Sequence, residues 1–345
     1  MAVKYLAGDR IIGTAAERAA LTVDAITSSN WGTHDTSTVS GQTIVKFTSS
    51  GHFRPTSAYN VEYLVVGGGG GSGAQIGGGG GAGGYRVSTS NAQNHAVTAQ
   101  TYTITVGAGG IRADTSASRR ATNGGNSTFD TITSAGGGFG ADNDISPYTD
   151  GNAGGSGGGG TYRGGAEDGG AGNTPSTSPS QGSAGGSKTG STTYGAAGGG
   201  GAGGVGQPDG SSTSGAGGVG IQNDITGTNL YYAGGGGGGS HSGGSNDGGL
   251  GGSGGGGRGG DDADASTAGT NGLGGGGGGG STDGTSQGKD GGSGVVILRF
   301  STSGNGVTTS DVPAVTFNTP NGTIFEESDT GKHYMFDGTD TWNEM

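Results

Sequence analysis

The chain of 345 residues contains no cysteine and only seven prolines. The absence of cysteine excludes disulfides and thiolate metal sites. The scarcity of proline, together with the lack of a strict Gly-X-Y period, excludes a collagen triple helix. Hydrophobic residues are also scarce, at 27% of the chain. They are too few for an ordinary globular core along the whole length.

Positive charge is in short supply as well, because 15 Lys and Arg face 27 Asp and Glu, for a net charge of −12. With no basic patch, we expect no nucleic-acid partner and no binding to anionic membranes. No run of about 18 apolar residues is present, so we expect no membrane insertion. The N-terminus MAVKYLAGDRIIG has no basic segment followed by an apolar one. We therefore expect no signal peptide and expression in a cytoplasm.

Glycine is what the chain has in excess, with 94 residues, most of which lie in Gly67–Asp290, in runs such as Gly234–Gly239. Composition alone favours a disordered linker. However, two apolar, strand-like segments bracket this region, VEYLVV (Val61–Val66) and GVVILRF (Gly294–Phe300). A flexible spacer does not need strong β-formers at both ends. The brackets therefore favour a folded glycine region, although glycine is the costliest residue to order.

A glycine run can form an extended helix close to polyproline II, which rises about 3.1 Å per residue. Packed side by side, such helices can bond backbone to backbone in several directions, because no Cβ holds them apart. Ordering each residue costs roughly 1–2 kcal/mol. A hydrogen bond returns about 0.5–1.5 kcal/mol, and each Cα–H···O contact adds about 0.5–1 kcal/mol. Since these terms nearly cancel, the bracketing strands must supply the remaining stability.

Several segments outside the glycine runs have the composition of strands. QTIVKFTSSGHFRP (Gln42–Pro55) predicts a strand, a turn at Ser50-Gly51 and a second short strand. Asn126–Gly138 is a weaker strand candidate. The stronger segments are predicted to share one small sheet: Val61–Val66, Tyr102–Val106 and Val295–Phe300, with Ile44–Phe47 as a candidate fourth strand.

The two ends of the chain have more ordinary sequences. Thr14–Leu21 is the best helix-forming stretch, with Thr14 and Glu17 spaced as a capping box. The C-terminal part predicts short strands in PAVTF, GTIFEE, KHYMFDG and DTWNEM, with a hairpin turn at Asp337-Gly338. We therefore expect three parts: an N-terminal attachment region (1–60), a glycine-rich domain (61–300) and a C-terminal β-hairpin module (301–345). The fold class is mainly irregular and β.

Four blocks of sequence carry a family resemblance, in this order: VEYLVVGGGGGSGAQIGGGGGAGGYR, TYTITVGAGG, GIQNDITGTNLYYAGGGGGG and GGSGVVILRF. Residues 61–300 thereby resemble the glycine-rich domain of many phage tail-fibre proteins and some bacterial surface proteins. That domain is related in kind to the tip adhesins of T-even-like phage long tail fibres. The C-terminal sequence GTIFEESDTGKHYMFDGTDTWNEM resembles a module of marine and cyanobacterial phage tail proteins.

The resemblance implies a sandwich of polyglycine-II helices, bracketed by a small β-sheet, that carries receptor-binding loops at one end. Tyr231 and Tyr232 would then pack inside the scaffold. The loops would be the polar inserts Asp142–Asp150, Thr161–Asp168, Asn173–Tyr194, Gln207–Ser214 and Ser240–Asp247. The candidate receptor-binding residues are Tyr148, Tyr162, Arg163, Tyr194 and His241. The alternative for each insert is an inert connector.

The function this implies is that of a tailed-phage virion protein, a tail-fibre or spike component that displays loops to a host receptor. Its partners would be other virion or tail proteins and a host surface receptor, either a glycan or an outer-membrane protein. It would form part of an oligomeric assembly and reside in the virion after assembly in the host cytoplasm. One alternative is a purely structural virion or decoration fibre without a receptor role. Another is a non-viral glycine-rich cell-surface protein.

Motifs for enzymatic chemistry are weak, and we expect no enzyme and no cofactor. G-x-G-x-x-G matches arise from glycine content alone, since none opens an amphipathic helix in a βαβ unit. Gly182–Thr189 misses the P-loop pattern, because Ser187 stands where glycine is required before Lys188 and no helix follows.

Metal binding is also weakly signalled, and we expect no metal. Gly256–Asp264 resembles a single calcium-binding nonapeptide, but such repeats occur in tandem. Its acidic residues Asp261, Asp262 and Asp264 are the weak metal candidates, and we interpret them as a solvated acidic loop. The five histidines are scattered without ligand spacing.

Overall fold

The computed structural model describes residues 4–6, 10–13, 31–36, 38–88, 92–114, 119–143, 150–161, 167–188, 194–210, 213–241, 247–282, 287–303, 305–307, 324–336 and 342–345. In this part of the chain all regular elements are β-strands, grouped in small and mostly antiparallel sheets, and no helix is present. The predicted mainly β and irregular class is therefore confirmed. The described residues also contain no helix that could cross a membrane. The chain forms two compact units, residues 30–309 and residues 1–29 with 310–345.

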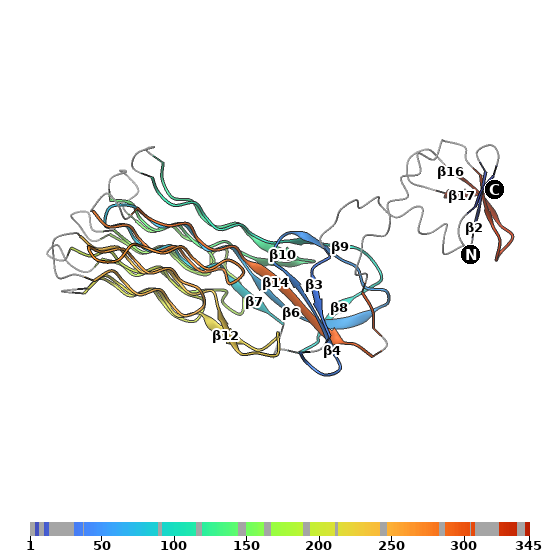
Figure 1. Ribbon diagram of the computed structural model, residues 1–345, viewed down its shortest axis with the longest axis horizontal. Coiled ribbons are helices and arrows are strands. Elements are labelled where there is room, and N and C mark those ends of the chain that lie inside the picture. The colour runs from blue at the N-terminus through green and yellow to red at the C-terminus, as the bar shows by residue number, and fades with distance from the viewer. Residues whose placement is uncertain are drawn as a thin grey trace. The chain divides into compact units, whose positions relative to one another are not determined.

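The first unit is built around the two bracketing strands, β6 (Tyr59–Val66) and β14 (Val295–Ser301). They pair antiparallel, from Val295 opposite Val66 to Arg299 opposite Glu62 (Figure 1). β4 (Gln42–Phe47) lies on the other side of β14, as predicted for the fourth strand. The sheet has the order β3 (Thr33–Asp35), β4, β14, β6, β7 (Tyr85–Val87), and β8 (His95–Val97) also pairs with β6.

The prediction that Tyr102–Val106 joins this sheet is wrong. β9 (Tyr102–Thr105) belongs to a second sheet with the order β11 (Ile132–Ser134), β10 (Ser127–Phe129), β9, β5 (Gly51–Phe53). The alternation in TYTITV explains the difference, because it buries Tyr102 and Ile104 and exposes the threonines. A strand with one solvent-exposed face can form an outer layer that packs on the sheet of β6 and β14, which we call the bracket sheet. The strands β6 and β14 themselves are buried on both faces.

Two apolar clusters cover the two faces of the bracket sheet. One joins it to the second sheet through the side chains of Val45, Phe47, Phe53, Val61, Tyr63, Val65, Val97, Tyr102, Ile104, Phe129, Val296, Leu298 and Phe300. The other contains Leu64, Val66 and Ile297 with Ile225 and Tyr232. Ile225 lies in the connection of the hairpin β12 (Ile221–Asn223) and β13 (Leu230–Tyr232), and Tyr232 ends that hairpin. The predicted packing role therefore holds for Tyr232, whereas Tyr231 is 39% exposed.

An ion pair lies within the bracket sheet. The Arg299 guanidinium contacts one carboxylate oxygen of the buried Glu62 through Nη2 at 2.7 Å and Nε at 2.8 Å. Burial raises the pKa of Glu62, and the Arg299 charge opposes this without cancelling it. The ion pair links β6 and β14 at the Glu62–Arg299 end of their paired stretch.

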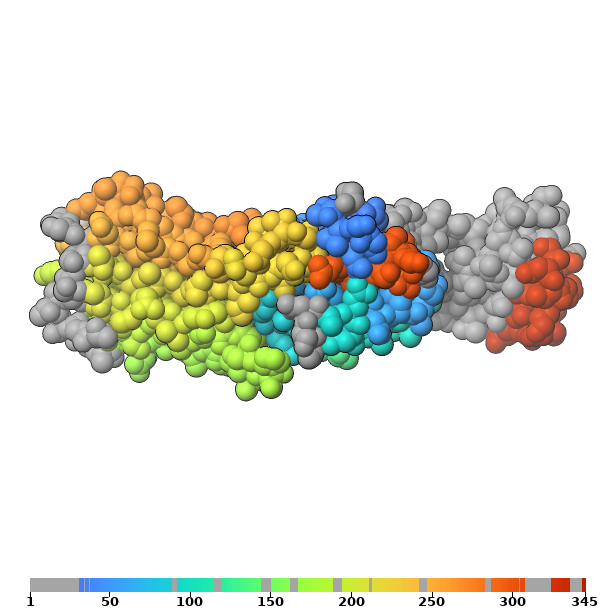
Figure 2. Space-filling model, turned by 90° about the horizontal axis from the view of Figure 1, so that it is seen from below, coloured from blue at the N-terminus to red at the C-terminus, as the bar shows by residue number. Residues whose placement is uncertain are grey.

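The glycine segments extend from the sheets as extended chains that lie side by side (Figures 1 and 2). Along residues 67–73, each N–H donates to a neighbouring segment, and every third N–H reaches the same one. Gly67, Gly70 and Gly73 donate to Gly84, Gly81 and Gly78; Gly68 and Gly71 donate to Gly125 and Thr122; Gly69 and Ser72 donate to Gly292 and Lys289. The same period of three recurs along residues 78–84 and 234–240. Each segment is thus bonded to several neighbours at once.

The direction of the segments follows from these pairs. Partner numbers fall as residue numbers rise from 67 to 73, so residues 78–84, 122–125 and 289–292 run antiparallel to residues 67–73. Segments therefore alternate between running away from the sheets and returning to them. Their spacing requires glycine, because a Cβ built on most of them would come within about 2–3 Å of a backbone atom in the next segment.

The second unit joins both ends of the chain in one sheet, with the order β1 (Lys4–Leu6), β2 (Arg10–Gly13), β15 (Ile324–Glu327), β16 (His333–Phe336), β17 (Trp342–Glu344). β2 and β15 are parallel, which brings the N-terminal and C-terminal segments together. β16 and β17 pair antiparallel, as the hairpin prediction requires. The predicted helix Thr14–Leu21, the PAVTF strand and the Asp337-Gly338 turn lie outside the described residues.

Candidate functional site

Several glycine segments end beside polar inserts, the connections between them, at the end of the stack remote from the sheets (Figure 1), which we call the outer end. The described residues that flank these connections are tied to one another by hydrogen bonds. These bonds are Asp168 N to Asp150 Oδ1, Lys188 N to Glu167 O, His241 N to Tyr194 O, and Ser214 N to Asp247 O. The outer end therefore gathers residues from inserts that are far apart in sequence.

One predicted insert, Asn173–Tyr194, is divided between the two ends of the stack. Its first part returns to the sheets, because Tyr85 N in β7 donates to Gln181 O at 2.8 Å. Gln181 Oε1 in turn accepts from Ala135 N, next to β11, at 2.9 Å. Only the last part of this insert, around Lys188 and Tyr194, belongs to the outer end.

Two of the five candidate residues are in contact at the outer end. The rings of Tyr194 and His241 have centroids 5.1 Å apart and planes tilted by 57°. Their backbones are joined by the His241 N to Tyr194 O bond of 2.9 Å and by an antiparallel bridge between Gly195 and Ser240. Tyr194 is 49% exposed. The pair is thus an aromatic surface on a fixed backbone frame.

Both residues of this pair are among the candidates predicted from the sequence. Their contact is not predictable from the sequence, because 46 residues lie between them. The other three candidates, Tyr148, Tyr162 and Arg163, lie outside the described residues.

A buried ion pair supports the same end. Lys188 Nζ lies 2.9 Å from Asp209 Oδ2, and both side chains are fully buried. Lys188 precedes one outer connection and Asp209 precedes another, so the pair ties two connections together. Lys188 is the lysine of the near P-loop match, and it here contacts a carboxylate. The sequence does not predict that Asp209, in the polar insert Gln207–Ser214, is buried and paired with Lys188, because a single acidic residue has no periodic pattern that would indicate burial.

The acidic residues considered for metal binding are arranged around an arginine. Arg258 contacts Asp261 through Nη2 at 2.6 Å and Asp264 through Nη1 at 2.7 Å. The Asp261 carboxylate also accepts bonds from the backbone N–H groups of Gly248, Ala263 and Asp264. Asp261 is buried, unlike the predicted solvated loop, whereas Asp262 and Asp264 are exposed.

Burial raises the pKa of Asp261, but the three backbone donors and the Arg258 charge outweigh it, so the pKa lies below its ordinary value. Asp261 thus remains a carboxylate and holds the turn at residues 261–264 through its bonds from Ala263 N and Asp264 N. Within the described ranges, no group of three or more His, Asp or Glu side chains is arranged to hold a metal ion.

The fold and its outer end define a class of protein in which glycine segments project from β-strand brackets and carry connections at the far end. The chain belongs to the glycine-rich domain family, whose model matches residues 48–301. The match includes both brackets and the glycine segments between them. No curated protein matches the chain.

Proposed function

We propose that the glycine segments are polyglycine-II helices. Such helices have three residues per turn and no internal hydrogen bonds. The period of three in the partners of residues 67–73 and 78–84 supports this assignment, because each face of a threefold helix meets its own neighbour. The close backbone approaches also support it, since they leave no space for a Cβ.

We further propose that the chain is a tail-fibre or spike component of a tailed-phage virion and that its outer end binds the host surface. The observation that carries the proposal is that described residues flanking several polar inserts are hydrogen-bonded to one another at the outer end, where the exposed Tyr194 ring contacts the ring of His241.

The physical basis of the proposal is rigid display. Tyr194 and His241 are hydrogen-bonded to each other's segments through their backbones, so they lose little further backbone entropy on binding, and preorganisation of this kind strengthens association. Aromatic rings suit both sugars and protein surfaces because they bury large area at low side-chain entropy cost. The scaffold thus supplies position, and the connections supply specificity for a glycan or an outer-membrane protein.

The test is binding of the fluorescently labelled full-length protein to cells of the bacterial host, with competition against adsorption of the phage that encodes it. The protein should coat the cells and slow adsorption. The double variant Tyr194→Ala/His241→Ala should lose this effect. Tyr231→Ala, which removes an exposed tyrosine of the β12–β13 hairpin at the sheet end, is the matched control and should retain it.

Failure of the intact protein to bind or compete would end the receptor-binding proposal. The purely structural virion role would then be the better account. Equal loss in the double variant and the Tyr231→Ala control would also contradict the assignment of binding to the outer end.

A further inference from the structure

We propose that residues 173–181 guard the edges of both β-sheets in the first unit and stop a second copy of the chain from adding a strand there. β7 is the end strand of the bracket sheet, and β11 is the end strand of the second sheet. An end strand carries unpaired backbone groups that act as a template for another strand. The 173–181 segment lies at the sheet end of the glycine stack, so this inference does not depend on the proposed function of the outer end.

The register of β7 determines which of its backbone groups face outward. Ser88 N, directly after β7, donates to Tyr63 O in β6 at 3.1 Å. Because bonded and non-bonded residues alternate along an antiparallel pair, the backbone groups of Tyr85 and Val87 point away from β6. Tyr85 N donates to Gln181 O at 2.8 Å, whereas the outward groups of Val87 have no partner in the described ranges. The 173–181 segment thus occupies the place where a further strand would begin to pair.

The same glutamine also binds the end strand of the second sheet. Gln181 Oε1 accepts a hydrogen bond from Ala135 N, directly after β11, at 2.9 Å. The Gln181 side chain is buried, with 1% of the residue exposed. Gly84 leaves room for it just before β7, because a Cβ on Gly84 would lie 2.4 Å from Gln181 Oε1. One residue therefore satisfies backbone N–H groups at the end strands of both sheets.

The 173–181 segment does not offer a new edge in place of the one it covers. Gln181 N donates to Asn173 Oδ1 at 3.2 Å, and Gln181 Nε2 donates to Pro175 O at 2.7 Å. Every polar group of Gln181 therefore has a partner within the protein. Pro175 and Pro179 are exposed on the segment, and proline has no N–H to donate to an incoming strand. Coverage by a proline-bearing segment is a known means of preventing edge-to-edge pairing.

The conformation of the segment depends on the Asn173 side chain. Asn173 Oδ1 accepts from Thr177 N at 3.0 Å, and Asn173 Nδ2 donates to Thr177 O at 3.2 Å. Together with its bond from Gln181 N, the Asn173 amide ties the middle and the end of the segment to its beginning. Removal of the Asn173 and Gln181 side chains should therefore release the segment from the sheets.

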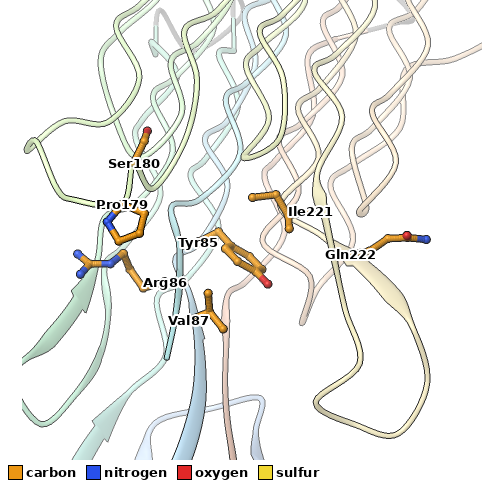
Figure 3. A pocket seen from close by; sticks show the side chains of 7 residues that line it. All are labelled: Tyr85, Arg86, Val87, Pro179, Ser180, Ile221 and Gln222. Atoms are coloured by element: carbon orange, nitrogen blue, oxygen red, sulfur yellow. The ribbon is translucent and has the colours of Figure 1, made fainter. Parts of the chain in front are cut away.

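No further strand of the described ranges covers the edge of β7. A cavity of about 250 Å³ lies beside it, with the 173–181 segment on one side and β12 on the other (Figure 3). It is lined by Tyr85, Arg86, Val87, Pro179, Ser180, Ile221 and Gln222. A released segment would therefore leave this edge open. The partner that fits it is a second copy of the chain, because two identical β7 edges can pair antiparallel about a twofold axis, which closes the contact.

The experiment measures the mass of the full-length protein by size-exclusion chromatography with light scattering, over a range of concentrations. Asn173→Ala/Gln181→Ala should associate to about twice the mass of the unmodified protein, because the freed β7 edges pair. Amide hydrogen exchange should become slower at Val87 N in the associated form, since this group gains a partner. The control is Gln207→Ala, which removes an exposed glutamine from another polar insert and should leave the mass unchanged.

Circular dichroism shows whether each variant is folded. If Asn173→Ala/Gln181→Ala is unfolded, the milder variant Gln181→Ala decides in its place, because it keeps the Asn173 bonds to Thr177. The proposal is overturned if the folded variant keeps the mass of the unmodified protein, or if Gln207→Ala gains the same mass. Association without slower exchange at Val87 N would also overturn it, because the contact would then lie elsewhere.

Discussion

Replacement of one glycine inside the stack by alanine tests whether backbone contact holds the segments together. A Cβ on Gly199 would lie 2.1 Å from the carbonyl oxygen of Gly80 and 2.4 Å from its carbon. The two backbones must therefore separate by more than 1 Å before they reach ordinary contact at 3.4 Å. No flexible side chain is available to absorb this displacement.

The cost can be worked out from the hydrogen bonds at this position. Gly80 O accepts from Gly236 N, Gly199 N donates to Gly236 O, and Gly199 O accepts from Gly218 N. Loss of these three bonds costs about 0.5–1.5 kcal/mol each. The lower entropy of unfolded alanine returns about 0.4–1 kcal/mol. We therefore expect Gly199→Ala to lower the free energy of unfolding by about 1–4 kcal/mol.

The matched control is Gly204→Ala. Its Cβ would meet only Val219, with the nearest side-chain atom at 3.2 Å and the nearest backbone atom at 3.6 Å. We expect this variant to stay within about 1 kcal/mol of the unmodified protein. Denaturant unfolding measures both, and amide exchange at Gly236 localises the effect. Equal stability of the two alanine variants would refute the view that contact between backbones decides the stability of the stack.

Two further predictions concern charged groups. Asp209→Ala should lower the free energy of unfolding by about 3–5 kcal/mol, because it leaves the buried Lys188 charge without its carboxylate. The double variant Lys188→Met/Asp209→Leu should recover most of this loss, as measured by denaturant unfolding. A double variant as unstable as Asp209→Ala would contradict the view that the unpaired Lys188 charge causes the loss. The pKa of Asp261 is lower in the folded than in the unfolded protein, so its contribution is complete above the unfolded value of about 3.9 and is lost as pH falls through the folded value. The difference in free energy of unfolding between the unmodified protein and Asp261→Asn should therefore be larger at pH 7 than at pH 3. A difference independent of pH would contradict the lowered pKa of Asp261.

The brackets were predictable because their side chains carry the information. Val61–Val66 and Val295–Phe300 are apolar on both faces, so they had to be interior strands, and their position at the limits of the glycine region indicated that they pair. Ile44–Phe47 was identified on the same grounds. Tyr102–Val106 was assigned to the wrong sheet, although its alternation had already indicated a single buried face.

The contacts of the glycine segments were not predictable in the same way. Their partners are backbone groups, which are identical in every glycine, so no residue pattern indicates that residues 67–73 bond to three particular segments. The pair of Tyr194 with His241 and the pair of Lys188 with Asp209 depend on that arrangement. They could be found only after the segments were placed.

The pairing of β6 with β14 also determines when the glycine-rich unit can fold during translation. Glu62 faces Arg299 across more than two hundred intervening residues, and a contact between such distant positions closes slowly because loop entropy must first be lost. β6 leaves the ribosome long before its partner exists, with an apolar surface on both faces. The nascent chain therefore carries an aggregation-prone strand until translation reaches residue 301, and a helper protein that shields this strand would raise the yield of folded protein.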